Sequence, residues 1–210
     1  MTARGRGLLV IACGAIAREV LAVVRLNGSL DLTLRCLPAS LHNTPQRIAE
    51  RVDAKLIEAR AEGWERILVA YGDCGTGGAL DRVLASHQVE RLPGDHCYAF
   101  FTGVDDWLAM HDAEPRTFYL TDFLCRHFER LVVEGLGLDA HPELLGDYFG
   151  NYVRLVYLAQ TDDPALVAKA GRAAARLGLA LEVRRTGYGD LGSTVGRALA
   201  GAVVRVAGHD

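Results

Sequence analysis

The feature that most constrains this chain is a regular alternation of short, largely apolar runs with segments of helical period. The runs have the length of β-strands and occupy residues 7–12, 32–37, 67–71, 89–92, 117–120, 153–159 and 179–183. Such alternation is typical of parallel strands that helices connect and cover. The sequence therefore predicts an α/β fold, a mostly parallel sheet of about seven strands covered by helices on both faces, with Rossmann-like halves.

Length and composition suit one compact domain. The chain has 210 residues, of which 50% are hydrophobic and 23% charged, enough to bury a sizeable core. No low-complexity tract or repeat of fixed period divides it. We expect a single α/β domain over residues 1–210, with a division into two sub-domains near residue 112 as the alternative.

Charge and hydropathy exclude several classes of protein. The net charge of −3 gives no basic footprint, so nucleic acid is not an expected partner. No apolar run approaches the ~20 residues of a membrane span, and charges at Arg18 and Glu19 argue against a secretory signal. We expect a cytoplasmic protein with a small-molecule substrate, and a homo-oligomeric state stays open.

The most distinctive stretch is a glycine-rich turn between a predicted strand and a predicted helix. It reads Gly72-Asp73-Cys74-Gly75-Thr76-Gly77-Gly78 and would lie at the carboxyl end of its strand, where α/β sheets bind ligands. The backbone of Gly75, Thr76, Gly77 and Gly78 could cradle an anion at the helix N-terminus. The alternative is a tight turn in which Asp73 or Thr76 caps the helix.

Thiols and imidazoles follow several predicted strands. Five of them lie just after strand ends: Cys13, His42, Cys74, His96 and Cys97. If these ends share one sheet edge, the residues could converge on a metal, and zinc suits thiolate and imidazole ligands. We predict a zinc site with Cys74, Cys97 and His42 as its core and Cys13 or His96 as the next candidates. An iron–sulfur cluster is the alternative cofactor.

The same thiols and imidazoles also fit roles that involve no metal. A buried free cysteine is commonly a small hydrophobe, and a histidine in a loop is often a cap or a surface residue. No CxxC pair is present to mark a zinc finger or a redox motif. Cys74 could also act as a nucleophile, activated by the helix N-terminus, with His42 or His96 as its base.

Acidic and hydroxyl side chains decorate the other strand ends. Asp73, Asp122 and Tyr188 are candidate catalytic groups, as acids, bases or substrate-positioning residues. Thr121, Thr161 and Asp162 are candidate ligand-binding residues. Each of the acids and threonines could instead cap a helix, and Tyr188 could simply pack over its turn.

Several motifs carry a resemblance to a known family. They are Ala12-Cys13-Gly14, Leu41-His42-Asn43, YGDCGTGG (71–78), Asp95-His96-Cys97-Tyr98, YLTDF (119–123), LAQTDD (158–163) and TGYGDL (186–191). On these motifs the chain resembles the DUF1638 family of bacteria and archaea. The resemblance implies that the cysteines and histidines belong to shared motifs, and that a corrinoid-dependent methyltransferase is a candidate partner. It implies no particular activity.

Together these patterns predict a metal-dependent enzyme. A zinc ion held by cysteine and histidine would activate a small metabolite, through thiol or methyl-transfer chemistry or through hydrolysis. The alternative is a binding or accessory protein, without chemistry of its own, for a corrinoid-dependent methyltransferase system.

Overall fold

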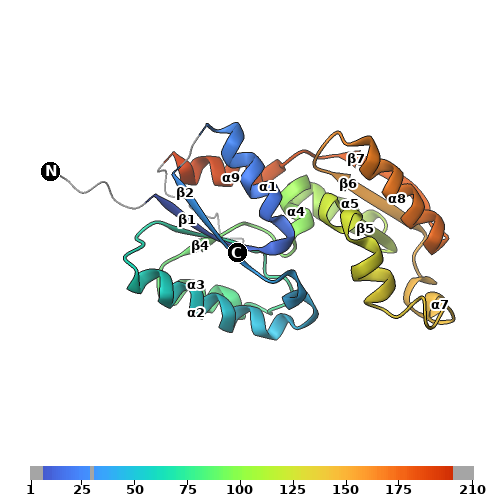
Figure 1. The fold of residues 1–210 in the computed structure, drawn as a ribbon, viewed down its shortest axis with the longest axis horizontal. Helices are drawn as coiled ribbons and strands as arrows, with labels where there is room; N and C mark the ends of the chain where they lie inside the picture. Colours follow the sequence, from blue (N-terminus) through green and yellow to red (C-terminus); the bar gives the residue numbers. More distant parts are fainter. Residues whose placement is uncertain (1–6, 29–30, 201–210) are drawn as a thin grey trace. The chain divides into compact units, whose positions relative to one another are not determined.

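The computed structural model describes residues 7–28 and 31–200, which form two compact units. Unit 1 comprises the chain up to Val104 together with the segment from Tyr188 onward, and unit 2 comprises Asp105–Gly187. Each unit has its own parallel sheet and its own hydrophobic core (Figure 1). The prediction of an α/β fold is confirmed, whereas the prediction of one sheet of about seven strands is wrong.

Unit 1 is built on a four-stranded sheet with the order β2-β1-β3-β4. The strands are β1 (Leu8–Cys13), β2 (Leu32–Leu37), β3 (Ile67–Ala70) and β4 (Glu90–Arg91). The central strand β1 is buried along its whole length, as a continuous apolar run in a parallel sheet requires. Both of its neighbours are parallel to it, so their carboxyl ends meet at one edge.

Helices cover both faces of this sheet. Helices α1 (Ala17–Leu26) and α9 (Gly189–Leu199) pack together on one face, and α2 (Ile48–Ala61) and α3 (Ala79–His87) on the other (Figure 1). Helix α4 (Cys97–Thr102) packs against α9. Three short 3₁₀ segments complete the unit: η1 (Gly14–Ile16), η2 (Ala39–Asn43) and η3 (Pro45–Arg47).

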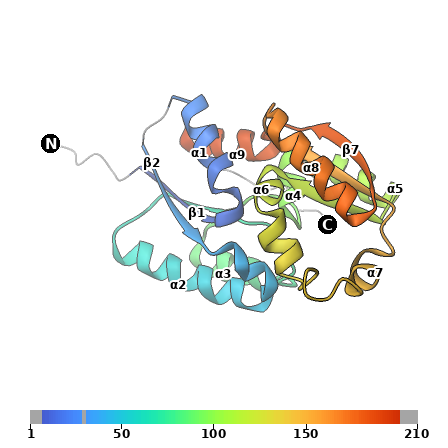
Figure 2. The same ribbon diagram turned by 45° about the vertical axis from the view of Figure 1, so that its right-hand side comes forward.

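Unit 2 holds a three-stranded parallel sheet with the order β5-β6-β7. Its strands are β5 (Thr117–Thr121), β6 (Arg154–Ala159) and β7 (Ala180–Arg185). Helices α6 (Asp122–Arg126) and α8 (Pro164–Leu177) contact each other and the sheet (Figure 2). The unit also contains α5 (Val104–Ala113), which begins at the boundary, the π-helical η4 (Glu129–Glu134) and α7 (Leu144–Phe149).

Two local features of the structure differ from what their residue types suggest. The sequence over residues 100–110 has a helical pattern throughout, but it is divided between two helices, α4 and α5, because Gly103 separates them at φ 89°, a left-handed value that a helix interior does not allow. Asn43 and Thr44 precede the helical pattern of residues 46–61 and are of the types that cap helices. Neither η3 nor α2 has a side-chain cap, so the first turn lacks that hydrogen bond.

Candidate functional site

The strand order of unit 1 marks a place for a ligand. From β1 the chain moves to β2 on one side and then to β3 on the other side of β1. Where strand order reverses in this way, the carboxyl ends of the two neighbouring strands flank a crevice in which α/β proteins bind ligands. In unit 1 this place lies between the end of β1 at Cys13 and the end of β3, just before Tyr71.

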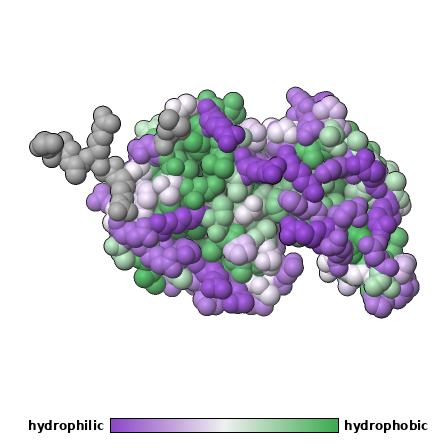
Figure 3. All heavy atoms as spheres, in the orientation of Figure 1, coloured by the Kyte–Doolittle hydropathy of each residue, from purple (hydrophilic) through white to green (hydrophobic). Residues whose placement is uncertain are grey.

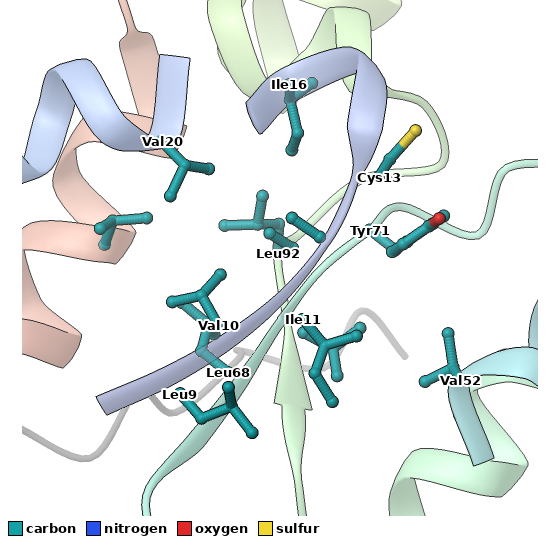
Figure 4. Packing of buried hydrophobic residues seen from close by; sticks show 14 of the residues in the cluster. Leu9, Val10, Ile11, Cys13, Ile16, Val20, Val52, Leu68, Tyr71 and Leu92 are labelled. Carbon is teal, nitrogen blue, oxygen red and sulfur yellow. The ribbon is translucent and has the colours of Figure 1, made fainter. Parts of the chain in front are cut away.

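Cys13 and Tyr71 lie at this crevice, and both side chains are uncharged. In Figure 4 both side chains point to the same side, away from the aliphatic residues of the core. The thiol of Cys13 accepts a hydrogen bond from the backbone N–H of Ala15 at 3.4 Å. Burial raises the pKa of Cys13, and burial together with the nearby Cys13 thiol strongly raises the pKa of Tyr71.

The glycine-rich turn after β3 carries Cys74 toward the next loop. A Cβ at Gly72 would lie only 3.0 Å from the carbonyl oxygen of Gly94, so glycine is what allows the two segments to approach. The backbone N–H of Cys74 then donates to the carbonyl of Asp95 at 2.7 Å. Cys74 itself has φ 51°, a strained value for a non-glycine residue of the kind that clusters at functional sites.

The Asp73 carboxylate occupies the turn that was expected to cradle an anion. It accepts hydrogen bonds from the Thr76 hydroxyl at 2.5 Å and from the N–H groups of Gly77 and Gly78 at 3.1 and 2.9 Å. Partial burial opposes ionisation of Asp73, but these hydrogen bonds prevail and lower its pKa. An external anion would have to compete with this internal one, so the geometry favours a structural role for Asp73 in the turn. The Thr76 hydroxyl is the group that reaches helix α3, because it accepts from the backbone N–H of Leu80 at 3.3 Å.

His42 lies in η2 with its ring held in one orientation. Its Nδ1 lies 3.2 Å from the carbonyl oxygen of Ala39 and 3.8 Å from the Cys13 sulfur. A carbonyl can only accept, so Nδ1 carries the proton and Nε2 keeps its lone pair. Among the described residues, this buried Nε2 has no hydrogen-bond partner. Burial lowers the pKa of His42, which keeps the ring neutral.

His96 and Cys97 begin helix α4. His96 is the N-cap of that helix, and its Nδ1 accepts from the backbone N–H of Tyr98 at 3.4 Å. The same Nδ1 lies 3.6 Å from the Cys97 sulfur, and the rings of His96 and His42 are 6.3 Å apart between centroids. Burial, with a smaller contribution from His42, lowers the pKa of His96 to about 4.

These five residues form what we call the thiol–imidazole cluster: Cys13, His42, Cys74, His96 and Cys97. Burial raises the pKa of Cys74 to about 12, and it raises the pKa of Cys97 well above its ordinary value with added contributions from Cys74 and Cys13. The thiols of Cys13, Cys74 and Cys97 are therefore close enough to raise one another's pKa, and they are protonated at neutral pH. No three His, Cys, Asp or Glu side chains of residues 7–28 and 31–200 stand in the geometry of a metal site.

One acid near the cluster is absent from the sequence predictions. Glu19 lies in α1 and is only 4% exposed, and its charge contributes to raising the pKa of Cys97. The sequence does contain a sign that Glu19 is buried, since its spacing places it on the same helix face as the buried Ile16 and Val23. An acid within an apolar stripe is a reason to expect a buried polar role.

The remaining candidates divide between the two units. Tyr188 packs against the core of unit 1, as do Cys74 and Cys97. Asp122, Thr121, Thr161 and Asp162 belong to unit 2. These four residues follow strands of the three-stranded sheet, so they do not share a sheet edge with the cysteines and histidines of unit 1.

In unit 2, two of the candidates, Asp122 and Thr161, belong to a hydrogen-bond network around Asp122, which is fully buried. We call it the Asp122 network. Its carboxylate accepts from the Tyr157 hydroxyl (2.6 Å), the Gln160 N–H (3.0 Å), the Thr161 hydroxyl (2.5 Å) and the Arg126 guanidinium (3.2 Å). These partners tie the end of β5 to the end of β6.

The two other candidates of unit 2 have local partners. The Thr121 hydroxyl accepts from the N–H of Leu124 and caps α6, and the exposed Asp162 pairs with Arg185 at 2.5 Å. Structural roles thus account for the contacts of both residues.

The fold and the site together define the class of this protein. It is an α/β protein with two parallel sheets, and thiols and imidazoles cluster at the strand ends of one of them. A family model described as "Protein of unknown function (DUF1638)" matches residues 36–195, and the chain belongs to this family. The match includes His42, Cys74, His96 and Cys97, whereas Cys13 precedes it. No curated protein and no solved structure matches the chain.

The predictions about the cofactor, substrate, partner, oligomeric state and location of the protein stay predictions. They are the zinc ion, the small-molecule substrate, the corrinoid methyltransferase partner, the homo-oligomer and the cytoplasmic location. Within the described part of the chain, none of the helices has the length and apolarity needed to cross a membrane.

Proposed function

We propose that unit 1 binds a soft divalent metal ion, most suitably zinc, in the thiol–imidazole cluster, and that the protein is an enzyme acting there on a small metabolite. The observation that carries this proposal is the state of His42. Its Nδ1–H is directed to the carbonyl of Ala39, while its buried Nε2 has no partner among the described residues. Metal-binding histidines are oriented in this way, with one ring nitrogen hydrogen-bonded and the other left for the ion.

The donor set fits such an ion. Cys74, Cys97 and His42 offer the sulfur and nitrogen ligands that zinc prefers, and Cys13 is the next candidate. We place Cys13 ahead of His96, because Nδ1 of His96 is already used to cap α4. Binding has to draw the thiols together as they lose their protons, because no three ligands stand in metal-binding geometry within residues 7–28 and 31–200.

The alternative of a bare cysteine nucleophile is less well supported. A nucleophilic thiol needs a lowered pKa, which a nearby cation or a helix N-terminus provides. Burial instead raises the pKa of Cys74 to about 12. The protonated state of the cluster is therefore an argument against an unassisted thiolate, whereas a bound cation would stabilise the ionised thiols.

When bound, a zinc ion would supply Lewis-acid activation of a thiol, a water or a methylated substrate. Asp73 would hold the turn that positions Cys74, through its hydrogen bonds to Thr76, Gly77 and Gly78. Tyr188, which packs against the same core as Cys74 and Cys97, is the residue that we propose to position the substrate.

The test is cobalt substitution followed by visible spectroscopy. We expect the wild-type protein to bind about one Co²⁺ per chain with sulfur-to-cobalt charge-transfer bands, and zinc to displace it. The variants Cys74→Ala and His42→Ala should lose these bands, whereas Cys125→Ala, which removes a buried thiol of unit 2, should keep them.

Two different outcomes would change the proposal. A brown protein with iron and sulfide would move the cofactor to an iron–sulfur cluster. A protein that binds neither cobalt nor zinc would overturn the metal site and leave the accessory-protein alternative.

A further inference from the structure

A second binding place in unit 1 lies between the end of β2 and helix α2. It is a pocket of about 460 Å³, within the size range of small-molecule sites. Cys36 of β2, Ser40 and Thr44 line one side of it, and Arg47, Arg51 and Lys55 line the other.

The basic side chains follow one another at intervals of four residues. This spacing places Arg51 and Lys55 on one side of α2, and Arg47, which directly precedes the helix, lines the same pocket. The chain as a whole is acidic, with a net charge of −3, so the concentration of cations in one pocket runs against the composition. Figure 3 shows hydrophilic side chains gathered over α2.

Two of the three cations have no ion partner in the described chain. Lys55 pairs with Glu58 at 2.6 Å, whereas neither Arg47 nor Arg51 forms an ion pair with any residue of 7–28 or 31–200. Among the described residues that line the pocket, the exposed Glu58 is the only acid. Unpaired guanidinium groups are donors suited to carboxylate and phosphate oxygens, which they bind in a bidentate geometry.

The start of the helix adds to this positive field. Neither η3 nor α2 has a side-chain cap, and the hydroxyls of Ser40 and Thr44 have no hydrogen-bond partner within residues 7–28 and 31–200. The partial positive charge of a helix N-terminus favours an anion there. Two hydroxyl groups and two guanidinium groups thus line one volume.

We infer that this pocket binds a small anionic metabolite, one that carries a phosphate or carboxylate group, with Arg47 and Arg51 as its main ligands. The pocket adjoins the thiol–imidazole cluster along the chain, because Ser40 and Leu41 line it and His42 follows directly. The inference does not depend on a metal in that cluster, and it can hold or fail separately.

Cys36 provides a reporter for the pocket. It is the one exposed cysteine of the five, so an alkylating reagent should modify it before the others. We would measure the alkylation of Cys36 by peptide mass spectrometry at constant ionic strength. The probes would be pyrophosphate for the phosphate class and citrate for the carboxylate class.

We expect saturable protection of Cys36 by at least one probe, and the stronger probe identifies the anionic group. The double variant Arg47→Gln/Arg51→Gln should need at least about tenfold more anion, because both guanidinium ligands are gone. Arg172→Gln, which removes an exposed charge on α8, is the matched control and should behave like the wild type. The protection should also persist in Cys74→Ala, whatever that variant does to metal binding.

Protection by neither probe would overturn the inference. Equal protection of the wild type and the double variant would overturn it as well, because the anion would then act elsewhere.

Discussion

The Asp122 network of unit 2 and the thiol–imidazole cluster of unit 1 occupy corresponding places, each at the carboxyl ends of buried parallel strands. In the network, the Asp122 carboxylate is surrounded by four donors. In the cluster, the thiols are protonated, and His42 Nε2 has no partner among the described residues. The saturated hydrogen bonding of the Asp122 carboxylate indicates a structural role, whereas the lone pair of His42 Nε2 is available to a ligand.

The largest expected effect concerns the Asp122 network. The variant Asp122→Ala removes a fully buried carboxylate and leaves Arg126, whose side chain is 20% exposed, without this charge partner. We expect the free energy of unfolding to fall by about 3 to 5 kcal/mol, as when one member of a buried ion pair is removed. Urea denaturation measures this loss.

Asp162→Asn is the control for that variant. It changes an exposed acid in the same unit, whose pairing with Arg185 should contribute no more than about 1 kcal/mol. If the two variants were equally stable, the structural role assigned to the Asp122 network would be wrong.

A smaller effect is expected from Cys125, the buried thiol beside the Asp122 network. Burial, with a contribution from Asp122, raises the pKa of Cys125 from 9.0 to about 12. Between pH 9 and 12 the unfolded chain gives up this proton while the folded chain keeps it. The folded state therefore binds more protons in this window, and its stability must fall as pH rises, by up to about 1.4 kcal/mol per pH unit for this group.

Cys125→Ala should remove that part of the alkaline slope. Denaturant titrations of the wild type and the variant at several pH values from 9 to 12 measure the difference. Parallel stability curves for the two proteins would contradict the assignment of a raised pKa to Cys125.

The smallest effect concerns the strained backbone of Cys74. At φ 51° glycine is favoured over alanine, so Cys74→Gly should be more stable than Cys74→Ala by about 1 kcal/mol. Both variants should lose the metal. This would separate the functional value of the thiol from its contribution to folding.

Gln88 is the matched control for this comparison, because it is the other non-glycine residue of the described chain with positive φ, at 53°. Gln88→Gly should likewise be more stable than Gln88→Ala, yet both should bind metal as the wild type does. A metal site that survives in Cys74→Gly would show that the Cys74 thiol is not a ligand.

The sequence predicted the strands and helices well, because each one is specified locally. The run at residues 32–37 became β2 with the same bounds, and α1 ends at Asn27 and Gly28, residue types that are typical of helix ends. The pairing of strands into two sheets was not predictable in the same way. Periodicity indicates which segments are strands, but it carries no information on which strands become neighbours.

The candidate site shows the same division. The residues of the thiol–imidazole cluster were found because their types and strand-end positions stand out in the sequence. The glycine-rich turn was left open between an anion cradle and a tight turn, and only the hydrogen bonds from Gly77 and Gly78 to Asp73 distinguish the two. Glu19 was missed because a buried acid is recognised only once the helix face that it occupies is known to be covered.

The central claim is that sulfur and nitrogen from the thiol–imidazole cluster bind one metal ion. X-ray absorption spectroscopy of the zinc-loaded protein tests it most directly. We predict sulfur atoms at about 2.3 Å and nitrogen at about 2.0 Å from zinc, with sulfur lost in Cys74→Ala. A zinc environment made only of oxygen and nitrogen, unchanged in that variant, would contradict the claim.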